Sequence, residues 1–269
     1  MGIVNLTDDS YYAASRCFSP AAAMTRIRTL VDEGAEIIDL GACSTRPGSE
    51  PVGAQEEWRR LKPVLEAVAV EMPDLHMSID TYHSSVISMA YELLASHLGA
   101  ETVRNQLIVN DISAGEDDPQ MLPLVGSLGL AYIAMHKRGD SVTMQNLTEY
   151  DDVVQDVKSY FDAFAEKAQS AGLRDWILDP GFGFAKTVEQ NYQLLNDLDV
   201  MADKVSGAPR ILVGVSRKSM IYKPLDLQPD DVLPATQAVH MAALMKGADI
   251  LRVHDVKEAR QTVRLYQFL

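Results

Sequence analysis

Polar side chains recur along this chain at the ends of short apolar runs, where packing alone would not select them. They are Asn5, Asp80, Asn110 with Asp111, His136, Asp179, Ser216 and His254. Carboxylates and amides together offer the donors and acceptors that the edge of a heterocycle requires. Any one of these residues could instead cap a helix or close a turn. The whole set is better explained by a shared active site.

Asp179 makes the strongest chemical demand of this set. A carboxylate buried without a partner costs several kcal/mol, so it needs a cation or the N–H groups of a ligand. The next residues, 180–186, read Pro-Gly-Phe-Gly-Phe-Ala-Lys, a rigid turn with two aromatic rings for a flat substrate. We expect one of those rings, Phe182 or Phe184, to be core packing instead.

A second segment, residues 41–48, reads Gly-Ala-Cys-Ser-Thr-Arg-Pro-Gly. Its hydroxyls and the Arg46 guanidinium suit an anion or a carboxylate, and Thr45 and Pro47 lie on either side. The alternative is an ordinary turn with a solvated arginine. Cys43 has no activating base in the nearby sequence, so we do not expect it to be a nucleophile.

Cationic residues also follow the last two apolar runs. Ser216 is followed by Arg217 and Lys218, and strand alternation places Arg252 and His254 on one face of the eighth run. Eight such runs predict a barrel of eight strands, as set out below, and barrels often bind phosphate near strands seven and eight, so the sequence predicts a phosphate-bearing substrate. A structural role for His254 is the alternative.

The first run ends in Asn5 and continues Leu-Thr-Asp-Asp-Ser through residue 10. Amide and carboxylate oxygens are ligands suited to Mg²⁺, although the same string would cap a helix. The sequence contains no Ser-His-Asp ordering, Cys/His metal cluster or Gly-rich phosphate loop. The chemistry indicated is therefore binding, orientation and charge stabilisation of a departing anion, without a covalent intermediate.

The elements that position these residues are visible as eight short apolar runs alternating with amphipathic stretches. The predicted strands are 2–5, 37–41, 77–80, 107–111, 131–136, 176–179, 211–216 and 250–254. Apolar residues at helical spacing predict helices over 21–33 and 153–171, each followed by a glycine suited to a left-handed cap. This alternation predicts a parallel α/β sheet closed into a single (β/α)8 TIM barrel over residues 1–269.

Composition disfavours several classes of partner. The formal net charge of −14 disfavours nucleic acid and anionic membranes, although local cations could still bind a small anion. No apolar run approaches the roughly 20 residues that span a bilayer. Only two cysteines occur and the N-terminus lacks a signal-peptide pattern, so we expect a cytoplasmic location.

In order and spacing, these motifs resemble the dihydropteroate synthase family over essentially the whole chain. The matching segments are GIVNLTDDS, DLGACSTRPGS, SIDTY, NDISAG, MHKRG, DPGFGFAK, VSRKS and RVHDV. The resemblance implies condensation of 6-hydroxymethyl-7,8-dihydropterin pyrophosphate with 4-aminobenzoate, giving 7,8-dihydropteroate and pyrophosphate. It also implies an SN1-like course, in which pyrophosphate leaves first and the aryl amine then attacks.

The resemblance assigns expected roles to individual residues. The pterin site would contain Asp80, Asn110, Asp179 and Lys218, with Met135 and Phe184 near it. The pyrophosphate would be bound by Asn5, Arg252 and His254 together with Mg²⁺. The 4-aminobenzoate site would contain Thr45, Arg46, Pro47, Phe184, Ser216 and Lys218. A homodimer, formed through the C-terminal helices, is a further expectation from the resemblance.

Some residues depart from the family pattern. Ala185 stands where the family usually has glycine, and Asp8 where it often has proline. The family usually has a segment before the first strand, so Met1 is expected to be internal to a longer native chain. A methyltetrahydrofolate-type methyltransferase barrel is the alternative function, because it would share the pterin residues. A folate-pathway binding or scaffold protein with a vestigial site is a second, non-enzymatic alternative.

Overall fold

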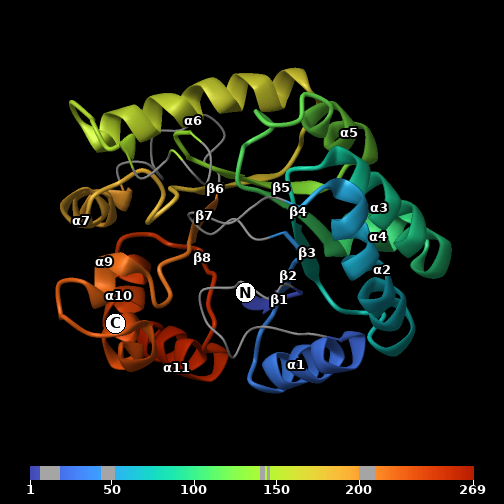
Figure 1. Cartoon of the computed structure of the whole chain (residues 1–269), viewed down its shortest axis with the longest axis horizontal. Coiled ribbons are helices and arrows are strands. Elements are labelled where there is room, and N and C mark those ends of the chain that lie inside the picture. Colours follow the sequence, from blue (N-terminus) through green and yellow to red (C-terminus); the bar gives the residue numbers. More distant parts are fainter. Residues whose placement is uncertain (7–18, 44–51, 140–142, 144–145, 200–209) are drawn as a thin grey trace.

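The structure is a computed structural model that describes residues 1–6, 19–43, 52–139, 143, 146–199 and 210–269. Eight parallel strands follow one another in sequence order around a curled sheet, with helices on its outside (Figure 1). The strands are β1 (Gly2–Asn5), β2 (Ile38–Gly41), β3 (Met77–Asp80), β4 (Leu107–Asp111), β5 (Ala131–Met135), β6 (Trp176–Asp179), β7 (Arg210–Val213) and β8 (Ile250–Leu251). The predicted barrel of alternating strands and helices is confirmed.

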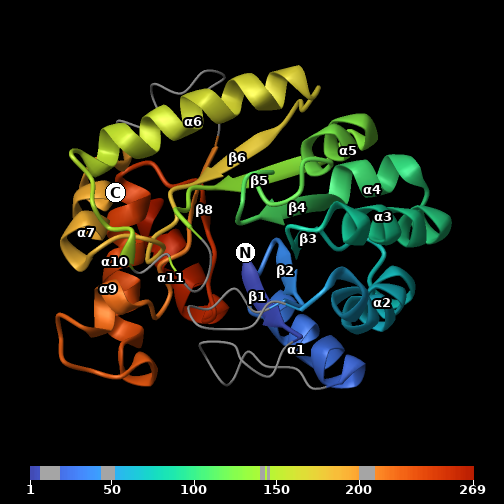
Figure 2. The ribbon, with the colours of Figure 1, turned by 45° about the horizontal axis from the view of Figure 1, so that its top comes forward.

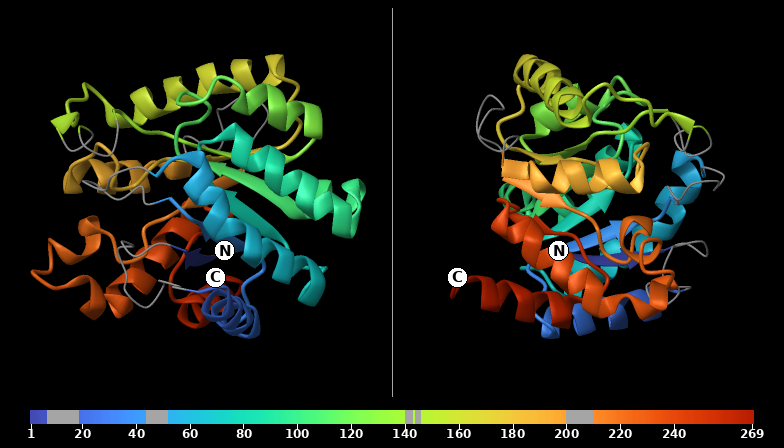
Figure 3. Two further views of the ribbon diagram at one scale, coloured as in Figure 1. Left: turned by 45° about the vertical axis from the view of Figure 1, so that its right-hand side comes forward. Right: turned by 90° about the vertical axis from the view of Figure 1, so that its left-hand side faces the viewer.

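The helices lie between successive strands and surround the sheet, as a tilted view also shows (Figure 2). They are α1 (Pro20–Asp32), α2 (Ala54–Glu71), α3 (Ser84–Leu98), α4 (Ala100–Gln106), α5 (Met121–Leu128), α6 (Val153–Ser170), α7 (Val188–Asn196), α9 (Ser219–Tyr222), the 3-10 helix η3 (Pro229–Asp231), α10 (Leu233–Met245) and α11 (Val256–Tyr266). The last helix, α11, lies beside the first, α1, so the two ends of the barrel wall meet (Figure 3).

Both helices predicted from apolar spacing have local signals that fix their ends. The Ser19 hydroxyl accepts a hydrogen bond from the Ala22 N–H at the start of α1, and Asp152 accepts from Val154 at the start of α6. Gly34 follows α1 with φ of 101° and Gly172 follows α6 with φ of 79°, a conformation that L side chains rarely adopt. The predicted glycine caps are confirmed.

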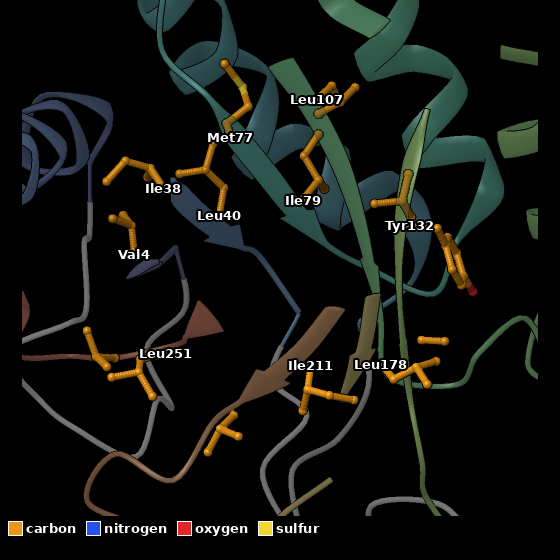
Figure 4. Packing of buried hydrophobic residues seen from close by; sticks show 14 of the residues in the cluster. Val4, Ile38, Leu40, Met77, Ile79, Leu107, Tyr132, Leu178, Ile211 and Leu251 are labelled. Carbon is orange, nitrogen blue, oxygen red and sulfur yellow. The ribbon is translucent and has the colours of Figure 1, made fainter. Parts of the chain in front are cut away.

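Strand alternation divides the barrel's apolar side chains into two clusters. Residues that point outward pack against the helices, among them Val4, Ile38, Leu40, Met77, Ile79, Leu107, Tyr132, Leu178, Ile211 and Leu251 (Figure 4). The intervening residues Ile133, Ile177 and Leu212 form a separate small cluster. Because successive side chains of a strand point to opposite faces, this second set lines the interior of the barrel.

Three strands end earlier than predicted, β5 by one residue, at Met135, and two others by more. β7 ends at Val213 rather than at residue 216, and β8 at Leu251 rather than at residue 254. Beyond those points the chain bonds to side chains as well as to neighbouring backbone; for example, the His254 N–H donates to the Ser216 hydroxyl at 3.3 Å. A bridge between Gly2 and Val253 still joins the last strand to the first and closes the barrel.

No helix in the described part of the chain is long and apolar enough to cross a membrane.

Candidate active site

The strand residues predicted to form the site point into the barrel at its C-terminal rim. In the sheet, Asn5 is level with Gly41, Gly41 with Asp80, and Asp80 with Asn110. A Cβ atom at Gly41 would lie 3.4 Å from the Asn5 Oδ1 atom and 3.7 Å from the Asp80 Cβ. Glycine at this position therefore leaves room between the two polar side chains. Farther round, Met135 is level with Asp179.

Arg252 links two buried carboxylates inside the rim. Its Nε donates to the Asp39 Oδ2 atom at 2.6 Å, and its Nη2 donates to the Asp80 Oδ2 atom at 2.6 Å. Asp39 also accepts a hydrogen bond from the Asn110 amide at 3.2 Å and one from the Ser78 hydroxyl. Removing one partner of a buried ion pair typically costs about 3–5 kcal/mol, so Arg252 holds this side of the site together.

Asp39 is a site residue that the sequence reasoning missed. It lies in the middle of an apolar run and its side chain is fully buried. The available signal was a charged residue in a strand that is otherwise apolar, since such a residue requires a partner. The partner, Arg252, lies 213 positions away in the sequence. Burial raises the pKa of the neighbouring Asp80, and the Arg252 guanidinium opposes this increase.

Asp179, Lys218 and Arg252 meet around Gly214. A Cβ atom placed there would lie 3.9 Å from the Asp179 Oδ2 atom, 3.9 Å from the Lys218 Nζ atom and 4.0 Å from the Arg252 Cβ. Burial raises the pKa of Asp179, and Lys218 opposes that rise. Burial lowers the pKa of Lys218 to about 8, and Asp179 is the main opposing group. The two groups thus stabilise each other's charged forms.

The turn after β6 brings one aromatic ring to this cluster. The Lys218 ammonium donates to the Phe182 carbonyl at 2.6 Å and lies 4.8 Å from the centre of the Phe184 ring. Phe182 itself is fully buried in the core, whereas Phe184 is only partly buried. One ring is therefore core packing, as expected, and the other borders the site.

His254 and Ser216 form a neighbouring pair. The His254 Nδ1 atom lies 3.1 Å from the Ser216 Oγ atom, and the His254 carbonyl accepts from Arg26 at 2.7 Å. Burial lowers the pKa of His254 to about 3, and Arg252 adds to this effect. The imidazole is consequently neutral at pH 7, so it would bind an anion through an N–H group and not through a positive charge.

Two of the polar residues at strand ends point away from the interior and are structural. Asp111 accepts from the N–H groups of Ser113 and Gly115 at 2.7 and 2.9 Å and from the Tyr132 hydroxyl at 2.6 Å. His136 faces Lys186, with its Nδ1 atom 3.0 Å from the ammonium nitrogen. For these two residues the alternative explanation from the sequence applies: they stabilise turns and packing and do not line the site.

Arg217 separates Ser216 from Lys218 and faces the outer wall. Its guanidinium makes two hydrogen bonds to Asp255, at 2.8 and 2.9 Å, and further bonds to the carbonyl groups of Pro229 and Asp230. Its backbone has φ of 55°, which is uncommon outside glycine. This anchoring keeps its two neighbours at the rim.

Thr45, Arg46 and Pro47, predicted to serve the second substrate, lie outside the described residues. Cys43, just before them, is buried, and burial raises the pKa of its thiol. A raised pKa leaves less thiolate at neutral pH, in line with the expectation that this cysteine is not a nucleophile.

In the part of the chain that the structure describes, no group of three or more His, Cys, Asp or Glu residues could hold a metal ion. Mg²⁺, however, often binds through one or two protein oxygens plus the phosphates of a substrate. A single oxygen ligand at Asn5 fits that second mode.

The structure is an eight-stranded α/β barrel whose rim brings together buried carboxylates, a buried amide and a partly buried lysine, and comparison with known proteins identifies the class. Residues 1–254 match the family described as "Pterin binding enzyme". The chain belongs to this family.

Named relatives define the group within the family. A dihydropteroate synthase from Synechocystis is 40% identical over 98% of this chain and 88% of its own length. A mitochondrial folate synthesis bifunctional protein from Arabidopsis thaliana is 41% identical, but this chain spans only 47% of it. The crystal structure of the Thermus thermophilus dihydropteroate synthase in complex with 4-aminobenzoate has a TM-score of 0.83 and 38% identity, covering 100% of this chain and 93% of that one. This chain is a member of the dihydropteroate synthases, enzymes of folate synthesis.

Proposed function

We propose that this chain condenses 6-hydroxymethyl-7,8-dihydropterin pyrophosphate with 4-aminobenzoate to give 7,8-dihydropteroate and pyrophosphate. One observation supports this reaction above all: Asp80, Asn110, Asp179 and Lys218 converge at one rim with Arg252 between them. The similarity to dihydropteroate synthases favours condensation over the methyl transfer considered as an alternative.

The buried acids suit recognition of the pterin ring. Burial raises the pKa values of both Asp80 and Asp179, so N–H donors from a ligand would stabilise their ionised forms. The Asn110 amide can supply a donor and an acceptor beside them. Met135 and Phe184 provide apolar surface for the flat ring.

The cations at the rim suit the leaving group. Arg252 and a neutral His254 would bind pyrophosphate oxygens, together with Asn5 on the neighbouring strand β1. When the C–O bond to pyrophosphate breaks, the departing group takes the electron pair and the pterin methylene carbon becomes cationic. The Asp179 carboxylate would stabilise that cation. The amine of 4-aminobenzoate then forms the C–N bond and releases one proton.

Such a reaction requires no strong base, because an aryl amine is nucleophilic in its neutral form. Lys218 would contribute charge near the pterin and the Phe184 ring, and its pKa of about 8 keeps it mostly protonated at pH 7. Thr45, Arg46, Pro47 and Ser216 remain proposed residues of the 4-aminobenzoate site.

We also propose that Mg²⁺ takes part, held by Asn5 and by the pyrophosphate. The ion would neutralise charge on the departing anion. Removal of Mg²⁺ with a chelator should therefore raise the KM for the pterin substrate.

A homodimer through the C-terminal helices is a further proposal. Exposed apolar side chains occur at the end of α10 (Met245), at the end of α11 (Leu265 and Tyr266) and after it (Phe268 and Leu269). A contiguous apolar patch formed by such residues would be typical of a contact between protein chains. Sedimentation of the purified protein would test this proposal.

The low cysteine content supports a cytoplasmic location, which is likewise a proposal.

The decisive experiment is an assay of pyrophosphate release with and without 4-aminobenzoate and Mg²⁺. We expect release to depend on 4-aminobenzoate and to yield dihydropteroate in equal amount. Calorimetric binding of the pterin pyrophosphate without any turnover would contradict the proposed reaction and favour a binding protein with a vestigial site.

A further inference from the structure

Lys186 is a buried cation that the proposed reaction does not use. It follows the turn after β6, and only 6% of the residue is exposed. Burial of a lysine is rare unless its charge and its N–H groups have partners. The surroundings of Lys186 therefore require an explanation beyond general packing.

The lysine has three acceptors at hydrogen-bond distance. Its Nζ atom lies 3.0 Å from the His136 Nδ1 atom, 3.0 Å from the Gly181 carbonyl and 3.1 Å from the Phe184 carbonyl. An ammonium group has three N–H donors, so the charged form satisfies all three acceptors at once. Asp179 is the main group that opposes the lowering of the Lys186 pKa by burial.

Two lysines hold the same turn from different carbonyl groups. Lys218 donates to the Phe182 carbonyl at 2.6 Å, whereas Lys186 donates to the carbonyls of Gly181 and Phe184. Within the turn, the Gly181 N–H donates to the Asp179 Oδ1 atom at 2.8 Å. The position of the Phe184 ring is therefore tied to both lysines and to the carboxylate.

The backbone of this turn needs such support. Gly181 and Gly183 have φ of 70° and 81°, and Ala185 has φ of 49°, in the left-handed region that alanine rarely adopts. A Cβ atom at Gly181 would lie 2.0 Å from the His136 carbonyl oxygen, so the turn packs directly on the end of β5. Lys186 bonds to the same two elements, at His136 and within the turn.

We propose that Lys186 is a positioning residue for the condensation: it fixes the backbone of residues 181–184 and thereby places the Phe184 ring against the second substrate. The inference rests on the proposed function, specifically on the placement of 4-aminobenzoate beside Phe184. Lys186 itself does not contact the substrate in this account.

A double-mutant cycle tests the inference, with the KM for 4-aminobenzoate as the readout. Lys186→Met removes the three donors, and we expect the KM to rise on the order of tenfold. Phe184→Ala should raise the KM by a similar factor, because the ring itself is lost. If Lys186 acts through that ring, Lys186→Met should raise the KM by less than about twofold in the Phe184→Ala background.

Controls separate positioning from folding. Lys167→Met, at an exposed position on α6, should leave the KM unchanged. Lys186→Gln keeps two N–H donors, so it should fold more readily and raise the KM only about threefold. Thermal melting of each variant would show the folded fraction to which rates are normalised.

The outcomes are distinguishable. If Phe184→Ala leaves the KM unchanged, the proposed site for 4-aminobenzoate is wrong, and the inference is wrong with it. If Phe184→Ala raises the KM but Lys186→Met and Lys186→Gln do not, only the inference is overturned. The inference would also be overturned if Lys186→Met raised the KM for 4-aminobenzoate by the same factor with and without the Phe184→Ala substitution.

Discussion

Adjacent residues at the ends of β4 and β5 have opposite surroundings. Asn110 and Met135 point into the barrel and lie level with Asp80 and Asp179, respectively. Asp111 and His136 follow them directly, but they point outward and bond to the turn after β4 and to Lys186. A polar residue at a strand end is therefore not necessarily a site residue. Whether it belongs to the site depends on the side of the sheet that it faces, because successive residues of a strand face opposite sides.

The same rule separates site residues from core residues on the other strands. The inward side contains Asn5, Asp39, Asp80, Asn110, Asp179, Ser216, Arg252 and His254, and each makes contacts near the rim or is level with a residue that does. The outward positions of the same strands are filled mainly by core residues such as Leu40, Ile79 and Val109. If this division holds, substitution of an inward polar residue should lower activity, and substitution of an outward polar residue should lower stability.

We expect the largest effect from loss of the Lys218 charge, which lies beside the inward residues Asp179 and Arg252. Lys218→Ala should lower the rate of pyrophosphate release by about 100-fold or more, because preorganised charge at the reacting centre is lost. The melting temperature should be measured alongside, because this substitution also removes the cation beside the buried Asp179 carboxylate and the hydrogen bond to the Phe182 carbonyl, and rates are normalised to folded enzyme. Turnover close to that of the unmodified enzyme would contradict the role assigned to Lys218.

An outward polar residue should show the opposite pattern. Asp111→Asn places an amide where a buried carboxylate accepts from Ser113, Gly115 and Tyr132. The mismatch should lower the free energy of unfolding by about 2 kcal/mol. Urea denaturation would measure it, and an unchanged midpoint would show that the turn tolerates the amide.

His136 should affect the pH dependence of stability. Burial lowers its pKa to about 2 in the folded protein, from 6.5. Below pH 6.5 the unfolded chain binds a proton that the folded chain does not, so this residue makes the protein less stable as the pH falls. Between pH 6.5 and 5.5 the unmodified protein should lose about 1 kcal/mol more than His136→Asn. Equal losses in denaturant titrations at the two pH values would exclude this contribution.

The smallest expected effect concerns backbone strain. Ala185 is fully buried with φ of 49°, at a position where the family usually has glycine. Ala185→Gly should stabilise the protein by up to about 1 kcal/mol, because glycine adopts this conformation without steric cost. Calorimetric melting would measure the change. A clear loss of stability would show that the alanine methyl group contributes more through packing than it costs in strain.

The sequence predicted the fold closely because periodicity is a local property. The bounds of the strands 2–5, 77–80, 107–111 and 176–179 agree with the structure, and helix 21–33 differs by one residue at each end. The ends of β7 and β8 were placed too late, because polar residues that continue a strand pattern can leave the ladder to bond elsewhere.

The site was predictable in part. Motif order indicated most of the rim residues, and the structure brings Asp80, Asn110, Asp179, Lys218 and Arg252 together. Asp39 was missed because its pairing with Arg252 joins opposite ends of the chain. The role of Lys186 depends on its contacts with two backbone carbonyl groups and with His136. The spacing of residues in the sequence does not predict such contacts. The assigned roles of the rim residues are still predictions.

A paired measurement at the end of β4 tests the central claim most directly. Pyrophosphate release should be compared for Asn110→Ala and Asp111→Asn at equal concentrations of folded enzyme. We predict that Asn110→Ala lowers kcat/KM for the pterin substrate at least about tenfold, while Asp111→Asn retains more than about half of it. Equal losses in both variants, or the larger loss in Asp111→Asn, would contradict the assignment of the inward side to the reaction.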